Sequence, residues 1–237
     1  CAVDDIKYLT VDEQEKFLET AERSHNYRQY ALLLETGLRT AELIGLTWDA
    51  TDWKKRTLTV SKNLEYRHSQ GHWRAGPPKT QKSYRTIPLT DKAYSILKSC
   101  YDERDSRKES ETLLQVLEYI DSRTGEQKCL IMRDLVFVNW RTGEPAKNSS
   151  YDTRLYKLCD EAGMKRFCMH ALRHTYAARA VERGVPPKVL QQLLGHASIK
   201  TTMDRYVHVT DESMVNAVRQ FQEATPPASK KGRKKGV

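Results

Sequence analysis

Helix start and stop signals recur along the chain, and they constrain its fold more than any other feature. Thr10 stands three residues before Glu13, the spacing of a capping box, and predicts a helix over 11–23. Gly37 follows apolar residues at helical spacing and predicts the end of a helix over 26–36. Similar signals predict further helices over 41–46, 91–102, 150–162, 170–183, 186–194, 201–206 and 211–223.

A short part of the chain has the alternating pattern of strands instead. Residues 57–61 alternate polar and apolar side chains, and 85–89 resemble a strand that returns beside them. We expect residues 64–78, rich in Gly, Pro, His and Arg, to form a turn or loop, and 135–138 to form a short strand. The sequence thus predicts a mainly α fold with a small antiparallel β-sheet or hairpin, an α+β class.

The segment 103–130 is harder to assign because it is highly charged. It carries apolar residues at helical spacing, including Leu113, Leu117 and Ile120. We expect an additional helix here, as an insertion into the fold.

Composition excludes several classes of protein. Of the 237 residues, 38% are hydrophobic and 30% are charged, which is typical of a folded globular chain. No apolar run approaches the ~20 residues of a membrane span, and the acidic start lacks the features of a signal peptide. The first residue is Cys1 rather than Met, so we expect a fragment or a processed product.

The cysteines and histidines give little support for a metal site. Five cysteines, an odd number without a CxxC pair, indicate free thiols in the reducing cytosol. Cys168, His170 and His174 lie close in sequence, but no fourth ligand accompanies them. We therefore expect no metal and no other cofactor.

The net charge of +9 suggests a polyanionic partner without identifying one. Five of these charges belong to Lys and Arg residues after Pro227, so the rest of the chain carries only +4. We expect this tail, residues 225–237, to be disordered. Its charge either holds a polyanion nonspecifically or is simply solvated.

Several polar side chains suggest chemistry when they are taken together. Each has a simpler explanation alone: Arg39 can pair with Glu42 at a helix start, His196 can cap a helix, and Tyr206 can be a buried tyrosine with a bonded hydroxyl. The full set holds two arginines, two histidines, a tyrosine and the lysines near the strands: Arg39, Arg173, His170, His196, Tyr206, Lys79 and Lys82.

This set has the groups that phosphoryl transfer to a tyrosine requires. Guanidinium groups are planar and permanently charged, so they suit the charge that develops on a phosphodiester under attack. A phenol, with a pKa of about 10, needs a base or cationic neighbours before it can attack, and histidine can accept its proton. A lysine could then protonate the departing 5′ oxygen.

Three segments resemble the catalytic boxes of the tyrosine recombinases, also called the phage integrase family. They are residues 36–43, 170–175 and 193–202, and Tyr206 follows the last of them. The resemblance covers residues 7–222. It implies a site-specific DNA recombinase that excises and integrates a mobile element through a 3′-phosphotyrosyl intermediate and a Holliday junction, with neither ATP nor metal.

The resemblance assigns a role to each residue. Arg39 and Arg173 match the two arginines that bind the phosphate, and His196 matches the histidine that hydrogen-bonds it. His170 matches the residue thought to accept the tyrosine proton, and Tyr206 matches the nucleophile.

Other positions match supporting roles. Glu42 matches an acidic residue that supports the active site without reacting, and Lys79 best matches the general acid, with Lys82 as its competitor. Further basic side chains would contact DNA, with a strong dependence on salt: Lys62, Arg74, Lys82, Arg85 and Lys147.

The spacing between the last two catalytic positions points to a subgroup. Tyr206 lies ten residues after His196, where many members have nine. The longer spacing resembles integrases of conjugative transposons and related phages, which leaves a transposon or a phage origin open. The segment 103–130 would then contact DNA or a neighbouring subunit.

The resemblance also implies how the whole protein is organised. We expect a catalytic domain over 1–224, without the core-binding and arm-binding domains of complete members. The segment 211–223 would dock on a neighbouring protomer or, alternatively, on its own subunit. The implied partners are double-stranded DNA, further copies of the chain in a dimer to tetramer, and DNA-bending accessory proteins, in the cytoplasm and nucleoid of a bacterium and away from membranes.

Two other functions stay open. A relative of type IB topoisomerases would relax supercoils with the same chemistry, on DNA without a paired site. A regulator could use helices 170–183 and 186–194 as a helix-turn-helix, and it would bind DNA without a covalent product.

Overall fold

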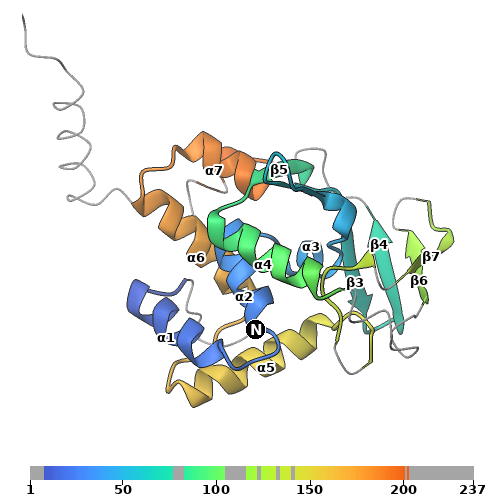
Figure 1. Cartoon of the computed structure of the whole chain (residues 1–237), viewed down its shortest axis with the longest axis horizontal. Coiled ribbons are helices and arrows are strands. Elements are labelled where there is room, and N and C mark those ends of the chain that lie inside the picture. The colour runs from blue at the N-terminus through green and yellow to red at the C-terminus, as the bar shows by residue number, and fades with distance from the viewer. Residues whose placement is uncertain are drawn as a thin grey trace, which may run out of the picture.

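Helix α2 lies among the other helices, and a four-stranded sheet projects on one side of them (Figure 1). The computed structural model describes residues 8–76, 83–104, 116–121, 124–131, 134–139, 142–200 and 202. In this part of the chain the helices are α1 (Val11–Ala21), α2 (Tyr27–Thr36), α3 (Thr40–Ile44), α4 (Asp91–Asp102), α5 (Asn148–Glu161), α6 (Met169–Glu182) and α7 (Pro187–Leu194), with a 3₁₀ turn at Trp48–Ala50.

These helices begin and end at the signals that the sequence contains. The Thr10 hydroxyl accepts a hydrogen bond from the Glu13 backbone N–H (3.2 Å), and the Glu13 carboxylate accepts one from the Thr10 N–H (2.8 Å). Gly37 and Gly195 end α2 and α7 in the left-handed conformation, each with φ +63°. The predicted helices over 11–23, 26–36, 91–102, 150–162, 170–183 and 186–194 are confirmed to within a few residues.

The core forms where these helices meet. α2 packs against α4 and α6, and α1 packs against α2 and α5. Phe17 of α1 contacts Tyr30 of α2 and Phe167, with ring centroids 5.5 and 5.1 Å apart. A second, smaller cluster joins α6 to α7 through Ala177 and Leu190. Burial of these apolar side chains is the main force that holds the helices in place.

Two small sheets occupy the middle of the chain. The first is antiparallel, in the order β1 (Thr51–Asp52), β2 (Thr57–Val60) and β5 (Arg85–Pro88). It confirms the strands predicted near 57–61 and 85–89. The second has the order β3 (Asn63–Arg67), β4 (His72–Gly76), β6 (Val116–Asp121) and β7 (Gln127–Ile131), and its β4–β6 pair is parallel.

The second sheet corrects two sequence predictions. The expected loop over 64–78 contains the hairpin β3–β4, in which Tyr66 pairs with Trp73 across the strands and Gly71 turns with φ +71°. The helix expected over 103–130 is wrong for β6 and β7, whose turn uses Gly125 at φ +75°. Apolar residues at helical spacing did not outweigh strand-forming side chains such as Tyr119 and Ile120. Residues 105–115 of that segment lie outside the described part of the chain.

The strand expected over 135–138 is reduced to a single bridge. Leu135 pairs with Thr47, and the Val136 N–H donates to the Leu46 carbonyl at 2.8 Å.

Among the described helices, none combines the length and the apolar character that crossing a bilayer would require.

Candidate active site

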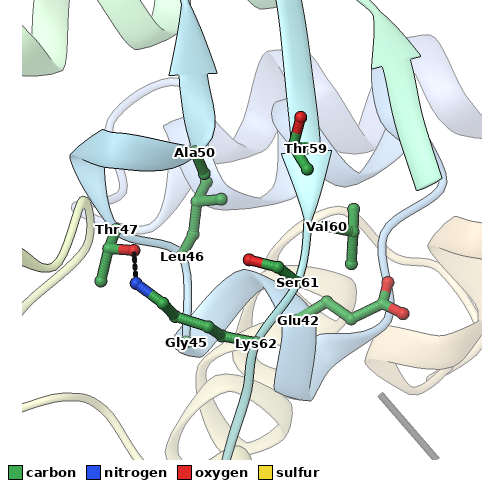
Figure 2. A pocket seen from close by; sticks show the side chains of 9 residues that line it. All are labelled: Glu42, Gly45, Leu46, Thr47, Ala50, Thr59, Val60, Ser61 and Lys62. Carbon is green, nitrogen blue, oxygen red and sulfur yellow. Dashed lines mark hydrogen bonds between the residues drawn. The ribbon is translucent and has the colours of Figure 1, made fainter. Parts of the chain in front are cut away.

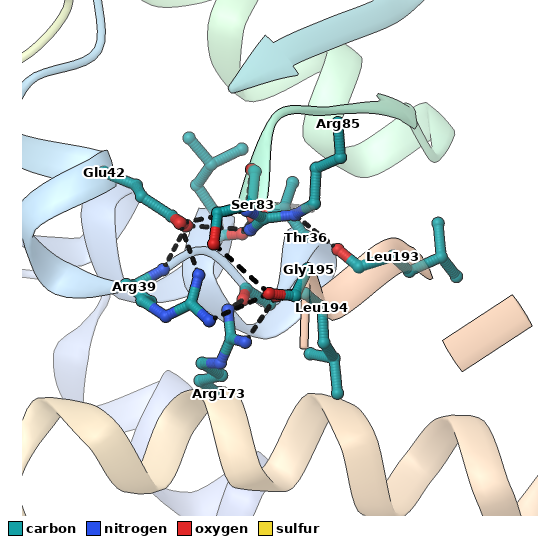
Figure 3. Close-up of polar contacts among 11 residues, drawn as sticks. Thr36, Arg39, Glu42, Ser83, Arg85, Arg173, Leu193, Leu194 and Gly195 are labelled. Carbon is teal, nitrogen blue, oxygen red and sulfur yellow. Dashed lines mark hydrogen bonds and ion pairs between the residues drawn. The ribbon is translucent and has the colours of Figure 1, made fainter. Parts of the chain in front are cut away.

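Three segments that are far apart in sequence meet at one polar cluster (Figure 3). The first runs from the end of α2 to α3, residues 37–42. The second is the start of β5, residues 83–85, and the third is the end of α7, residues 193–196. Helix α6 adds Arg173 to these segments, so the cluster combines three arginines with one carboxylate. Most of its carbonyl groups come from the turns that end α2 and α7.

Glu42 lies at the centre of the cluster and is almost completely buried. Burial alone would raise the pKa of its carboxyl group, but the hydrogen bonds and charges of Arg85, followed by those of Arg39, outweigh burial and lower the pKa to about 2. Glu42 is therefore a permanent interior anion at neutral pH.

Arg39 is held by hydrogen bonds to Glu42 and to the Gly195 carbonyl. Its Nη1 donates to Glu42 Oε1 at 2.7 Å, its backbone N–H donates to Glu42 Oε2 at 2.8 Å, and its Nη2 donates to the Gly195 carbonyl at 3.2 Å. The side chain keeps 35% of its surface exposed, in contrast to the buried Glu42. Arg39 is thus a fixed cation that an incoming anion could reach.

Arg85 lies deeper in the protein than Arg39 does, and the sequence predicts a different role for it. Its side chain is 5% exposed, and its guanidinium binds both oxygens of Glu42, at 2.9 and 2.7 Å. Its Nε donates to the Leu193 carbonyl at 2.6 Å. Contrary to the prediction of a DNA contact, Arg85 lies inside the site rather than on a DNA-facing surface.

Arg173 joins the two turns that carry the other groups. It projects from α6 and is 2% exposed, with Nη1 donating to the Gly37 carbonyl and Nη2 to the Leu194 carbonyl, both at 2.6 Å. Arg173 therefore places a second guanidinium beside that of Arg39, as Figure 3 shows.

Close packing at the two glycines makes this arrangement fit. A Cβ at Gly37 would lie 2.4 Å from the Tyr176 ring, and one at Gly195 would lie 3.1 Å from the Arg85 side chain. Both residues also have the positive φ that favours glycine. The sequence pattern around each glycine is thus required by the backbone as well as by helix capping.

The two histidines have different surroundings. His196 is nearly buried, and its Nδ1 lies 2.9 Å from the Thr202 hydroxyl, while its carbonyl accepts a hydrogen bond from Gln191 at 3.1 Å. His170 is exposed, with its ring centroid 4.5 Å from that of His174. The structure thus places His196 directly after Gly195 in the cluster, and His170 on the exposed side of α6.

The other basic residues predicted to contact DNA lie around the sheets. Lys62 lines a small recess beside Glu42 and donates from Nζ to the Thr47 hydroxyl at 2.9 Å (Figure 2) and to Asp49 at 3.0 Å. Lys147 places its ammonium 3.6 Å from the Tyr66 ring centroid, a cation–π contact with the β3–β4 hairpin.

Arg74, also on that hairpin, pairs with Glu65 in the strand register and is half-buried. Of these three residues, Lys62 thus lies at the recess that Glu42 also lines, whereas Arg74 belongs to β4 and Lys147 to the start of α5.

Some predicted residues cannot be placed. Lys79, Lys82, Tyr206, the docking segment 211–223 and the tail 225–237 lie outside the described residues. Among the described residues, no group of three or more His, Cys, Asp or Glu side chains could hold a metal ion.

Sequence reasoning missed the structural roles of Ser83, Arg85 and the Gly195 carbonyl. The Ser83 hydroxyl donates to the Gly195 carbonyl at 3.4 Å. One signal could have identified Arg85: it shares the inward face of β5 with buried Ile87, because alternate residues of a strand face the same side. A charged residue at an inward position requires a charged or hydrogen-bonded partner.

Comparison with known proteins identifies similar sequences. The model described as the phage integrase family matches residues 7–213. The chain is 31% identical over 220 residues to the tyrosine recombinase XerC-like protein of Caldanaerobacter subterraneus subsp. tengcongensis, covering 90% of this chain and 53% of that protein. It is 28% identical over 225 residues to the transposase from transposon Tn916 of Enterococcus faecalis, covering 91% and 51%. The chain spans about half the length of these curated relatives.

Solved structures have the same fold. The Tn1549 transposon integrase in complex with transposon right end DNA matches with a TM-score of 0.72 and 26% identity, over 93% of this chain and 69% of that chain. XerA recombinase matches with a TM-score of 0.62 and 24% identity, over 91% and 65%, which is a likeness of fold. The predicted α+β fold and the predicted likeness to transposon integrases are both confirmed.

Proposed function

Because the chain belongs to the phage integrase family, the tyrosine recombinases, we propose that it is the catalytic part of a site-specific DNA recombinase. Its reaction would be the excision and integration of a mobile genetic element. The proposal is supported by relatives that are named as transposases, and by a related integrase whose structure contains transposon DNA.

The observation that carries this proposal is that Arg39 and Arg173 both donate to carbonyl groups of the turn at Leu194 and Gly195, which leads directly into His196. Held guanidinium groups match the charge that develops on the non-bridging oxygens of a phosphodiester during attack. In this proposal Arg39, with its partly exposed side chain, and Arg173 bind the scissile phosphate, and His196 hydrogen-bonds it.

The bond-making steps belong to Tyr206 and a lysine. The Tyr206 oxygen attacks the phosphorus, its proton passes to His170, and a 3′-phosphotyrosyl bond replaces the bond to the 5′ oxygen. Lys79, or its competitor Lys82, protonates that oxygen as it leaves. The phosphotyrosyl bond conserves the energy of the phosphodiester, so a 5′-hydroxyl of another strand can reverse the step without ATP or metal.

The partners follow from the same reaction. Double-stranded DNA is the substrate, held in part by Lys62, Arg74, Lys82 and Lys147, and binding weakens steeply with salt. Copies of the chain assemble on DNA from dimer to tetramer through 211–223, and strand exchange through a Holliday junction requires four of them, with DNA-bending proteins as helpers. The setting is the cytoplasm of a bacterium, at the nucleoid.

A nicked duplex that traps the cleaved strand tests the nucleophile. We expect a covalent protein–DNA adduct on a denaturing gel, formed equally in EDTA. Tyr206→Phe removes only the attacking hydroxyl, so it should abolish the adduct and leave DNA binding within about twofold. Tyr8→Phe, at an exposed tyrosine that matches none of the catalytic positions, is the matched control and should behave like the wild type.

Different outcomes separate the alternatives. DNA binding without an adduct would favour a regulator and contradict the proposal. An adduct together with relaxation of supercoiled DNA that lacks a paired site would indicate a topoisomerase instead.

The general acid is tested with a substrate that bears a sulfur in place of the 5′ oxygen. A thiolate leaves without a proton, so Lys79→Ala should cut this substrate at nearly the wild-type rate and the ordinary substrate about 100-fold more slowly. Lys82→Ala should lose little on either substrate. The reverse pattern would assign the proton transfer to Lys82.

A further inference from the structure

We propose that Arg85 is a positioning residue for the cleavage reaction: by neutralising Glu42, it leaves the positive charge of Arg39 available to the DNA phosphate. This inference rests on the proposed function. It concerns a residue that does not itself reach the reacting atoms, because its side chain is 5% exposed and directed into the protein.

The geometry of the pair is that of a two-pronged ion pair. Nη1 and Nη2 of Arg85 bind the two oxygens of Glu42, at 2.9 and 2.7 Å. The same two oxygens accept hydrogen bonds from the Nη1 and the backbone N–H of Arg39, at 2.7 and 2.8 Å. One carboxylate is therefore shared by two arginines, one buried and one partly exposed.

The charge balance of this trio explains why the second arginine matters. Glu42 with Arg39 alone would be a neutral pair, and a neutral pair attracts a phosphate only weakly. Adding Arg85 gives the trio one net positive charge, and the exposed part of that charge is on Arg39. Charges act strongly on one another in such a poorly solvated place, so the added charge affects the phosphate site.

Arg85 also fixes the backbone that surrounds the phosphate site. Its Nε donates to the Leu193 carbonyl at 2.6 Å, and its Nη1 to the Ser83 carbonyl at 3.2 Å. The turn that follows Leu193 contains Gly195, whose carbonyl accepts a hydrogen bond from Arg39, and His196 comes directly after Gly195. These contacts are structural, so a test must distinguish them from the effect on charge.

The test compares Arg85→Met with the double variant Arg85→Met/Glu42→Gln. If Arg85 acts through charge, Arg85→Met should reduce adduct formation about 100-fold, the effect typical of losing one preorganised donor. Glu42→Gln in the double variant removes the negative charge that Arg85 no longer neutralises, and it should raise adduct formation at least tenfold above that of Arg85→Met. If Arg85 only holds the backbone, the second substitution restores nothing, because the contacts to Leu193 and Ser83 are still missing.

A neutral substrate gives an independent readout. A methylphosphonate at the scissile position has lost one charged oxygen, so less positive charge is needed beside it. The rate ratio of wild type to Arg85→Met should fall from about 100 on the phosphodiester to below about 5 on the methylphosphonate. A ratio that is equal on both substrates would overturn the inference.

Controls distinguish a variant that does not fold from a variant that contradicts the proposed role of Arg85. Removing one partner of a buried ion pair can unfold a protein, so each variant is checked by circular dichroism, and Arg85→Lys is measured beside it because lysine keeps the charge. Arg85→Lys should retain more adduct formation than Arg85→Met. Arg166→Met, which breaks an exposed two-pronged pair with Asp160 (2.9 and 2.8 Å), should match the wild type.

The two proposals fail in different ways. If the wild-type protein forms no adduct at all, the proposed function is overturned and the role of Arg85 with it. If the wild type forms the adduct and Arg85→Met forms it as fast as Arg166→Met does, the role of Arg85 alone is overturned.

Discussion

Glu42 carries a negative charge in the protein interior because Arg85 and Arg39 together bind both of its oxygens. The carboxyl pKa of about 2 in the folded chain compares with 4.5 for the free side chain. A lowered folded-state pKa stabilises the protein above the unfolded-state value and loses that contribution as the pH falls toward the folded-state value. At the scale of the residue, the ion network and the acid sensitivity of the fold are thus linked.

Glu42→Gln should make the protein less sensitive to acid. As the pH falls from about 5 to about 3, the Glu42 contribution to the wild-type unfolding free energy should drop by about 2 kcal/mol, which the variant cannot lose. Urea unfolding at both pH values measures this difference. If both proteins lose the same free energy over this range, Glu42 is not the interior anion described here.

At the scale of the element, local signals set the helix limits well. The capping box at Thr10 and the glycines at 37 and 195 gave helix ends close to the observed ones, because capping depends on neighbouring residues alone. The strands β3, β4, β6 and β7 were missed because strand pairing depends on residues far away in sequence. The parallel pairing of β4 with β6 has no local signal at all.

Gly37→Ala should destabilise the fold more than Gly184→Ala does. Both glycines have a positive φ, +63° and +75°, so both substitutions carry the cost of about 1 kcal/mol for that conformation. Only at Gly37 would the new Cβ meet another group, the Tyr176 ring at 2.4 Å, whereas nothing lies within 4 Å at Gly184.

The comparison needs only the free energies of unfolding from urea titrations. We expect Gly37→Ala to lose about 2 kcal/mol more than Gly184→Ala, a typical cost of overpacking. Equal losses would show that the ring moves aside freely.

At the scale of the whole molecule, the site exists only where distant segments meet. Arg39, Arg173 and His196 could be selected as candidates from the sequence alone, because they stand in recognisable segments. The pairing of Arg39 with Glu42 was predictable too, because the two residues are three apart. The contacts of Arg85 were not, because nothing near it in sequence indicates that Glu42 and the Leu193 carbonyl will surround it. Contacts of this kind arise from the packing of α7 against β5, which local patterns do not encode.

The cysteines report on this packing as a whole. Cys129 is exposed on β7, whereas Cys159 is buried and burial raises the pKa of its thiol. A thiol reagent at neutral pH should therefore label Cys129 within minutes and Cys159 only after unfolding. Comparing Cys129→Ser with Cys159→Ser measures this difference, and fast native labelling that disappears in Cys159→Ser would contradict the packing described here.

Because the cluster needs residues 37–42, 83–85 and 193–196 together, it can assemble only late in the synthesis of the chain. A chain that is still emerging from the ribosome has made Arg39 and Arg85 long before it makes the turn at Gly195. Until that turn closes onto them, the cations are not gathered, so an unfinished chain would lack the phosphate site that the proposed reaction requires.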